Sequence, residues 1–252
     1  MSGRTILITG ATGKLGRVMV ERFLSSGDTV VALFRNSSLE DLEQGRDQTR
    51  GRLIGIRCDL LEDGFARKLI DDLGEHGVQP DCLVNNARNI AFLKMQDDGT
   101  VSRSNFLDEF ALDVVAPYEL TMALAKWPAS RLRKVVNIGS QYGSVAANLG
   151  LYTDPSTQSS LHYSVAKAAL AHLTKELAVR LAPDGIQVNC IAFGGVEGRV
   201  DEEFRKRYAR LCPQGKMLTD AEVAGPVDML LSEHFSGMTG HVLAVDGGWT
   251  AW

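Results

Sequence analysis

Short apolar runs rich in β-branched residues alternate with segments of helical length along almost the whole chain. The strand-like runs cover residues 5–9, 29–34, 53–58, 81–85, 135–138, 186–192 and 242–245. Helical periodicity of apolar residues covers residues 14–26, 62–75, 104–126 and 161–182. Strands that alternate with helices form βαβ units, and right-handed crossovers place the helices on both faces of the sheet. We therefore expect an α/β fold built on a doubly wound parallel sheet of about seven strands, with helices on both faces.

The 252 residues show no repeat, low-complexity tract or linker, so we expect a single domain over residues 1–252. A net charge of −4 gives no electrostatic footprint for nucleic acid. We find no run of about 18 apolar residues, and so expect no membrane span. Residues 1–4 lead into the first apolar run without a signal-peptide cleavage region, which predicts a cytoplasmic location. The four cysteines and five histidines are scattered without metal-ligand spacing, so we expect no metal site.

Three glycines, Gly10, Gly13 and Gly16, follow the first strand and open the first helix. Glycine in such a turn allows a tight backbone and close approach of a pyrophosphate, which then rests on the helix N-terminus. A bare strand-to-helix turn would also explain glycines here. Their place at the start of a βαβ series favours dinucleotide binding and a Rossmann-like sheet.

The end of the second strand bears on the choice of cofactor. An acidic residue there would bind the adenosine ribose 2′-hydroxyl, whereas an arginine accommodates a 2′-phosphate. The sequence has Phe34-Arg35-Asn36 at this point, with no acid, and Lys14 adds a second positive charge in the glycine turn. We therefore favour NADP(H) over NAD(H).

A tyrosine and a lysine four residues apart, Tyr163 and Lys167, lie on a predicted helix. Residues at this spacing share one helix face. An ammonium group beside a phenol stabilises the phenolate and so suits the phenol for acid–base chemistry near neutral pH. Ser140 follows the fifth strand, where its hydroxyl could hydrogen-bond the reacting oxygen. A surface Tyr–Lys pair is the common alternative for such spacing alone.

The order of glycine turn, strand-end serine and Tyr-x-x-x-Lys helix resembles the short-chain dehydrogenase/reductase family, over essentially the whole length. Further matches are Asp59-Leu60, Asn85-Asn86-Ala87, Val188-Asn189 and Val245-Asp246-Gly247-Gly248. The resemblance implies that Ser140 orients the substrate oxygen, Tyr163 is the general acid/base, and Lys167 holds the nicotinamide ribose. It also implies a set of cofactor-binding residues: Gly10, Thr12, Gly13, Leu15 and Gly16 at the pyrophosphate, Asp59 and Leu60 at the adenine, Asn86 and Ala87 along the riboses, and Val196 near the carboxamide.

The sequence departs from the family's pattern at four places. The glycine spacing is that of the family's larger extended and atypical members, and Phe193-Gly194 replaces the usual Pro-Gly. Arg88 replaces the usual glycine after Asn85-Asn86-Ala87, where it either faces an anionic substrate or is solvated at the rim. Asp113 stands where the family has a catalytic-relay asparagine. Its backbone could still hold a relay water, but a carboxylate near Lys167 would change the local charge balance.

Two stretches are longer than simple connections. We interpret 141–160 as a substrate loop and 194–218 as a lid, because long loops at the carboxyl ends of strands surround the ligand site. The charged run 202–208 is expected on the surface without a chemical role. Trp249 and Trp252 are expected to be buried.

We therefore expect an NAD(P)-dependent oxidoreductase that transfers a hydride between the cofactor and a hydroxyl or carbonyl of a polar, sugar-like small molecule. Several short strings, such as Ser140-Gln141-Tyr142-Gly143, are similar to bacterial flagellin-modification and sugar-pathway enzymes. Two alternatives stay open: a 3-oxoacyl-carrier-protein-type reductase, and a non-catalytic nucleotide-sensing protein with the same fold. The resemblance also implies a homodimer or homotetramer.

Overall fold

The computed structural model describes residues 3–37, 39–43, 50–198 and 200–252. Within these residues, seven parallel strands form one sheet in the order β3-β2-β1-β4-β5-β6-β7. This arrangement confirms the expected Rossmann-like, doubly wound α/β fold. The strands are β1 (Thr5–Thr9), β2 (Thr29–Phe34), β3 (Arg52–Arg57), β4 (Cys82–Asn85), β5 (Lys134–Ser140), β6 (Gln187–Phe193) and β7 (Val242–Val245).

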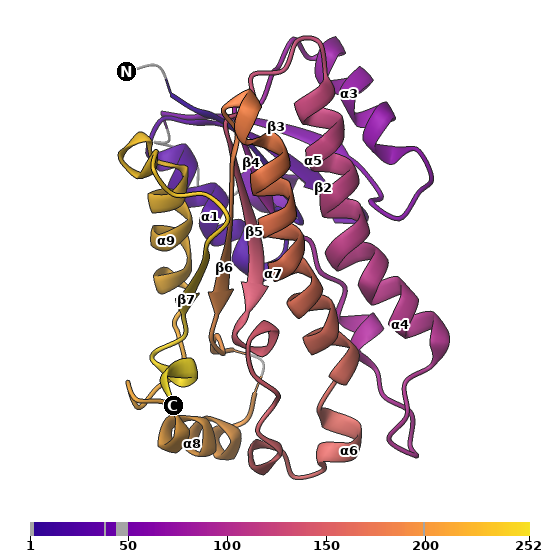
Figure 1. Ribbon diagram of the computed structural model, residues 1–252, viewed down its shortest axis with the longest axis vertical. Coiled ribbons are helices and arrows are strands. Elements are labelled where there is room, and N and C mark those ends of the chain that lie inside the picture. Colours follow the sequence, from indigo (N-terminus) through magenta and orange to yellow (C-terminus); the bar gives the residue numbers. More distant parts are fainter. Residues whose placement is uncertain (1–2, 38, 44–49, 199) are drawn as a thin grey trace.

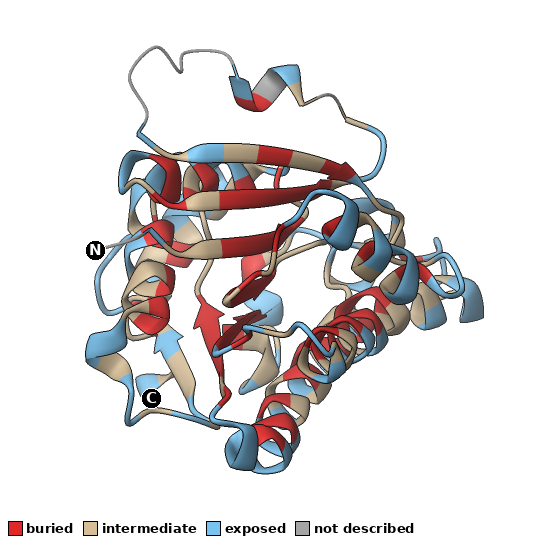
Figure 2. Ribbon diagram, turned by 90° about the horizontal axis from the view of Figure 1, so that it is seen from above, coloured by how far each residue is buried: buried red, intermediate tan, exposed pale blue. Residues whose placement is uncertain are grey.

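Helices pack on both faces of the sheet (Figure 1). The chain order of the helices is α1 (Lys14–Ser25), α2 (Glu40–Glu43), α3 (Phe65–Glu75), α4 (Arg103–Phe110), α5 (Ala116–Lys126), α6 (Pro155–Gln158), α7 (Leu161–Leu181), α8 (Glu202–Leu211) and α9 (Ala221–Leu231). On one face α1 and α9 bury Phe23 and Val227 against the sheet, and on the other α3, α5 and α7 bury Leu69, Leu120 and Leu177. The central strands are therefore covered on both sides, and Figure 2 shows their residues as largely buried.

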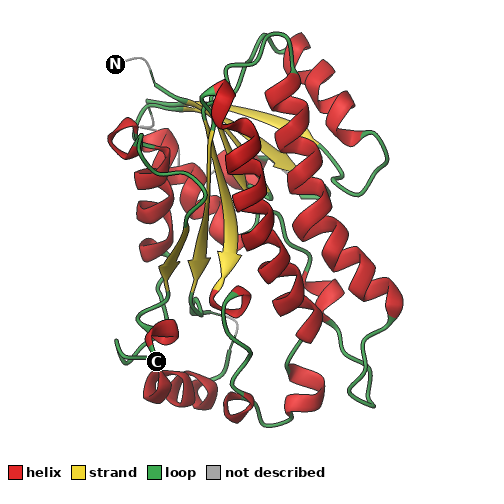
Figure 3. Ribbon diagram, in the orientation of Figure 1, coloured by secondary structure: helices red, strands yellow, loops and turns green. Residues whose placement is uncertain are grey.

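A third apolar cluster lies beyond the carboxyl ends of the strands. Leu151, Tyr208, Cys212, Met217 and Trp249 are all buried together there. Figure 3 shows the short helices α6 and α8 and several loops gathered at the arrowhead end of the sheet. We call this region, residues 141–160 together with 194–198, 200–218 and Trp249, the cap.

The structure differs from the sequence-based expectations in three details. The helix expected over 104–126 is two helices, α4 and α5, joined by a π-helical turn at Ala111–Val115. The expected substrate loop contains two 3-10 turns and α6. Trp249 is buried as expected, but the prediction for Trp252 is wrong, since this residue is 81% exposed at the chain end.

Among the described residues, none of the helices combines the length and apolar character that a membrane crossing requires.

Candidate active site

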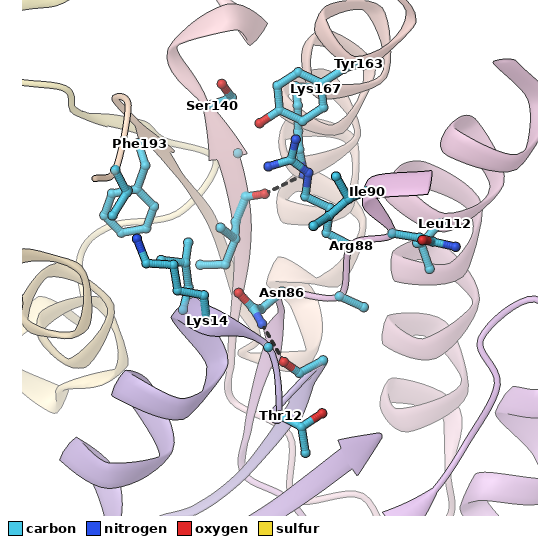
Figure 4. Close-up of a pocket in the computed structure, with 18 of the residues that line it drawn as sticks. Thr12, Lys14, Asn86, Arg88, Ile90, Leu112, Ser140, Tyr163, Lys167 and Phe193 are labelled. Atoms are coloured by element: carbon cyan, nitrogen blue, oxygen red, sulfur yellow. Dashed lines mark hydrogen bonds between the residues drawn. The ribbon is translucent and has the colours of Figure 1, made fainter. Parts of the chain in front are cut away.

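A cavity of about 600 Å³ opens at the carboxyl ends of the strands. The glycine turn and the ends of β2 and β4 line one part of it, and the end of β5, the start of α7 and the cap line the other. Figure 4 shows this division, with Thr12 and Asn86 at one end and Ser140 and Tyr163 at the other. Parallel sheets bind ligands at this edge, beside the point where the strand order reverses, which here lies between β1 and β4.

The glycine turn is shaped to admit only glycine at two positions. Gly10 has a φ of +62°, and a Cβ there would lie 2.8 Å from the Cα of Ala87. A Cβ on Gly16 would lie 2.3 Å from the carbonyl oxygen of Gly10. Helix α1 begins at Lys14 with Gly13 as its N-cap, and no side chain caps its first N–H groups. The turn therefore fits a pyrophosphate, which would accept hydrogen bonds from these N–H groups.

The hydroxyl of Thr9 joins the glycine turn to the loop after β4. Its oxygen accepts hydrogen bonds from the backbone N–H groups of Asn86 and Ala87, each at 2.9 Å. The Asn86 amide in turn donates to the carbonyl oxygens of Thr9, at 3.0 Å, and Gly10, at 3.1 Å. These bonds fix Asn86 and Ala87 on the cavity wall where the sequence predicts cofactor contacts. The role of Thr9 itself was not predicted.

The adenosine end of the cavity carries one exposed cation. Arg35, Asp59 and Leu60 line this end, and the guanidinium of Arg35 lies 4.0 Å from the Asp59 carboxylate. Lys14, expected to add a second charge here, also lines the cavity and forms a 3.0 Å ion pair with Asp220 at the N-terminus of α9. Arg35 is therefore the cation that the β2 end offers to a cofactor phosphate. Leu15 and Val196 also line the cavity.

The three expected catalytic side chains converge on the same cavity. Ser140 ends β5, while Tyr163 and Lys167 lie on one face of α7. The ammonium of Lys167 lies 5.7 Å from the centre of the Tyr163 ring and donates to the carbonyl oxygen of Ile138 at 2.9 Å. Figure 4 shows the phenol of Tyr163 and the hydroxyl of Ser140 both facing the open space.

Asp113 forms a buried ion pair with Lys167. Its carboxylate lies 3.0 Å from the ammonium, and both side chains are almost fully buried. Burial alone would favour the neutral amine, but the Asp113 carboxylate and the Tyr163 side chain in its phenolate form outweigh it and raise the pKa of Lys167. Lys167 is therefore held charged beside the phenol. The expected proximity of Asp113 to Lys167 is thus a feature of the structure.

Sequence reasoning did not identify Glu109, one helical turn before Asp113. Glu109 is 1% exposed, and neither of its carboxyl oxygens has a hydrogen-bond partner among the described residues. Burial, together with the Asp113 carboxylate, raises the pKa of Glu109 to about 7, although Lys167 and Arg88 oppose the shift. A buried acid that is partly protonated near neutral pH therefore lies behind the catalytic pair.

A hydrogen-bonded chain of polar side chains, also not predicted, joins the strands to the catalytic helix. The Asn85 amide donates to Asn137 at 2.8 Å, and the Asn137 amide donates to Thr174 at 2.9 Å. All three residues are buried. This series of hydrogen bonds connects β4, β5 and α7. It therefore holds α7, with Tyr163 and Lys167, in a fixed position relative to the carboxyl ends of the two strands.

The cap supplies the rest of the wall. Tyr208 accepts a hydrogen bond from the Gly195 N–H at 2.9 Å, donates to Gln141 at 3.1 Å and stacks on Trp249 at 4.5 Å between ring centres. Phe204, one turn earlier on α8, also lines the cavity. The expectation that 202–208 is simply a surface run is therefore wrong for Phe204 and Tyr208, which form an aromatic inner face of α8, and for Arg207, which donates to the Leu151 carbonyl oxygen at 2.7 Å.

A glycine turn that fits a pyrophosphate, set across a parallel sheet edge from Ser140, Tyr163 and Lys167, defines the class of nicotinamide-dependent oxidoreductases. Comparison with known proteins leads to the same class. The family model described as enoyl-(acyl carrier protein) reductase matches residues 10–250. The chain belongs to the short-chain dehydrogenase/reductase family, and is an oxidoreductase of that family.

Individual relatives match along nearly their whole length. A 3-oxoacyl-[acyl-carrier-protein] reductase of Aquifex aeolicus is 29% identical, with 98% of each chain covered. The post-translational flagellin modification protein A of Campylobacter coli is 26% identical, with 99% of each chain covered. A crystal structure of a short-chain dehydrogenase from Leptospira borgpetersenii with bound NAD+ superimposes with a TM-score of 0.86, at 27% identity, covering 99% of this chain and 94% of that one.

Proposed function

We propose that the protein transfers a hydride between NAD(P)(H) and a hydroxyl or carbonyl group of a polar, sugar-like small molecule. The observation that carries this proposal is the convergence of Ser140, Tyr163 and the charged Lys167 on a cavity whose other end is a glycine turn. A bound nicotinamide would supply or accept the hydride.

The chain's own residues supply orientation and the proton. Ser140 hydrogen-bonds the substrate oxygen, and Tyr163 donates its phenolic proton to that oxygen during reduction or removes it during oxidation. The Lys167 ammonium stabilises the phenolate that reduction leaves behind, and the buried Asp113 carboxylate keeps this ammonium charged. Gly10, Gly13, Gly16, Thr12 and Leu15 hold the pyrophosphate, and Val196 the carboxamide.

We favour NADP(H) as the cofactor. Supporting this choice, the end of β2 offers Arg35 and no carboxylate to the adenosine ribose, and a guanidinium binds phosphate well. We expect the wild type to bind NADP+ more tightly than NAD+, and Arg35→Ala to weaken NADP+ binding about tenfold while changing NAD+ binding little. Calorimetric titration of both cofactors into both proteins measures this. Tighter binding of NAD+ to the wild type would contradict the choice.

The aromatic lining of the cap supports a ring-shaped polar substrate, because sugar rings pack on aromatic faces while phenols hydrogen-bond hydroxyls. Reduction of a 3-oxoacyl group on an acidic carrier is the second candidate, favoured by the likeness to the Aquifex aeolicus enzyme. On α8, Arg205 and Lys206 pair with Glu202 and Glu203, which reduces the basic surface that the cap offers to such a carrier.

We also propose a homodimer or homotetramer located in the cytoplasm. Exposed apolar side chains gather on α4, the π-helical turn, α5 and the start of α7, where a second copy would cover them. They are Leu107, Val115, Tyr118, Leu161 and Val165. The four cysteines are all free thiols, which suits a reducing compartment.

The test of the proposed function is cofactor turnover with a panel of sugars, ketones and 3-oxoacyl thioesters, followed through the absorbance of reduced nicotinamide. We expect turnover by the wild type, and a fall of about a thousandfold in kcat for Tyr163→Phe with cofactor binding retained. Tyr118→Phe, which alters a phenol on α5 outside the cavity, is the matched control, and its oligomeric state is compared with that of the wild type because Tyr118 lies on the proposed contact between copies. Tight cofactor binding without turnover of any compound would instead support a nucleotide sensor.

A further inference from the structure

Arg88 brings an unpaired positive charge next to the catalytic phenol. Its guanidinium carbon lies 4.7 Å from the centre of the Tyr163 ring. The side chain is exposed, lines the cavity and extends toward that ring in Figure 4. Among the described residues, no carboxylate lies within ion-pair distance of Arg88, and no hydrogen bond of its guanidinium is formed.

Among the described residues, the acids near Arg88 form no ion pair with it. Asp113 is paired with Lys167, and Glu109 is buried with its pKa raised to about 7, so that it carries only part of a negative charge at neutral pH. Among the described residues that line the cavity, the acidic one is Asp59, which lies at the adenosine end beside Arg35. The end of the cavity where the substrate reacts therefore holds a net positive charge that is open to a ligand.

We propose that Arg88 binds a carboxylate of the substrate, so that the protein acts on hydroxy or oxo acids. This inference rests on the proposed function, because it places the reacting carbonyl oxygen at Tyr163 and Ser140. A molecule that reaches both the phenol oxygen and a guanidinium beside the same ring must carry the two groups close together. The favoured substrates are therefore 2-oxo and 3-oxo acids and their alcohols, including acidic sugars. A guanidinium can hold a carboxylate through two parallel hydrogen bonds, which also fixes which face of the carbonyl is presented.

The experiment compares each acid with its neutral amide. Pyruvate with pyruvamide, and acetoacetate with acetoacetamide, are titrated into the protein saturated with oxidised cofactor, which cannot reduce them, and binding is followed by calorimetry. The variants are Arg88→Gly, which restores the residue usual for the family, and Arg103→Ala. Arg103 begins α4, is exposed and does not line the cavity, so it controls for the loss of one positive charge.

We expect the wild type to bind at least one acid about tenfold more tightly than its amide, and Arg88→Gly to abolish this difference. Arg103→Ala should keep it. Equal binding of acids and amides by the wild type, or equal weakening of both by Arg88→Gly, would overturn the inference. Turnover of neutral ketones or sugars with no preference for acids would overturn the role of Arg88 and leave the proposed function standing. Acid-selective binding without turnover of any compound would support the role of Arg88 and overturn the proposed function.

Discussion

The two ends of the cavity are built from different kinds of contact. At the nucleotide end the backbone is held in place by local hydrogen bonds: the Asn86 and Ala87 N–H groups donate to the Thr9 hydroxyl, the Thr9 and Gly10 carbonyls accept from the Asn86 amide, and the start of α1 has no side-chain cap. At the cap the wall is mostly side chains, with Tyr208 stacked on Trp249 and bonded to Gln141. In the proposed function, the fixed backbone at one end would hold the cofactor, whereas the substrate would meet side chains that can vary without disturbing the sheet.

The largest expected effect follows from removing space at the nucleotide end. Gly16→Ala places a Cβ against the Gly10 carbonyl oxygen, so we expect a loss of about 2 kcal/mol in the free energy of unfolding and weaker cofactor binding. Gly74→Ala is the matched control, because nothing lies near its Cβ inside α3, and it should stabilise the protein by up to about 1 kcal/mol. Urea unfolding measures both. Equal changes in the free energy of unfolding for the two substitutions would contradict the claim that the glycine turn has no room for a Cβ at Gly16.

The second effect concerns Glu109, which lies behind the catalytic pair between the two ends. Its pKa is raised from 4.5 to about 7, so between these values the folded protein keeps a proton that the unfolded chain releases. The stabilising contribution is complete below about pH 4.5 and is lost as pH rises through about 7. Its slope is at most about 1.4 kcal/mol per pH unit.

The measurement is urea unfolding of the wild type and Glu109→Gln at several pH values across this window. The variant has no titrating group at this position, so the difference between the two proteins should shift in favour of the variant as pH rises. A difference that is constant with pH would contradict the raised pKa of Glu109.

The smallest expected effect lies in the cap. Tyr208→Phe keeps the ring on Trp249 but leaves the Gly195 N–H and Gln141 without this partner, so we expect a loss of about 1 kcal/mol in stability. The KM for the substrate should rise severalfold while the Kd for the cofactor is unchanged. Titration of the cofactor and steady-state kinetics separate the two. A higher Kd for the cofactor with an unchanged KM for the substrate would show that Tyr208 supports the nucleotide end and not the cap, and would contradict this prediction.

Features set by local spacing could be predicted from the sequence, whereas contacts between separate elements could not. The strands, the glycine turn and the Tyr163–Lys167 pair follow from local spacing, and the structure places each of them as expected. The Asn85–Asn137–Thr174 chain depends on which residues of separate elements meet in the folded core. Spacing along the chain carries no signal for such contacts.

The cap shows the limit most clearly. The charges of 202–208 indicate an exposed helix, and the helix is exposed on one face. Its aromatic face could have been noticed from the spacing of Phe204 and Tyr208, which are four residues apart and share one side of a helix. Only the position of Leu151 and Trp249 in space decides that this side is buried.

Hydride transfer from the cofactor to a carbonyl compound is tested most directly by tracing the transferred hydrogen with deuterium. Reduced cofactor carrying deuterium at C4 of the nicotinamide is incubated with the wild type and a panel of carbonyl compounds that includes 2-oxo and 3-oxo acids. Mass spectrometry of the products locates the label. The account predicts an alcohol with deuterium on the carbon that bears the new hydroxyl, and loss of this product in Tyr163→Phe. Bound cofactor that passes no deuterium to any of these compounds would contradict it.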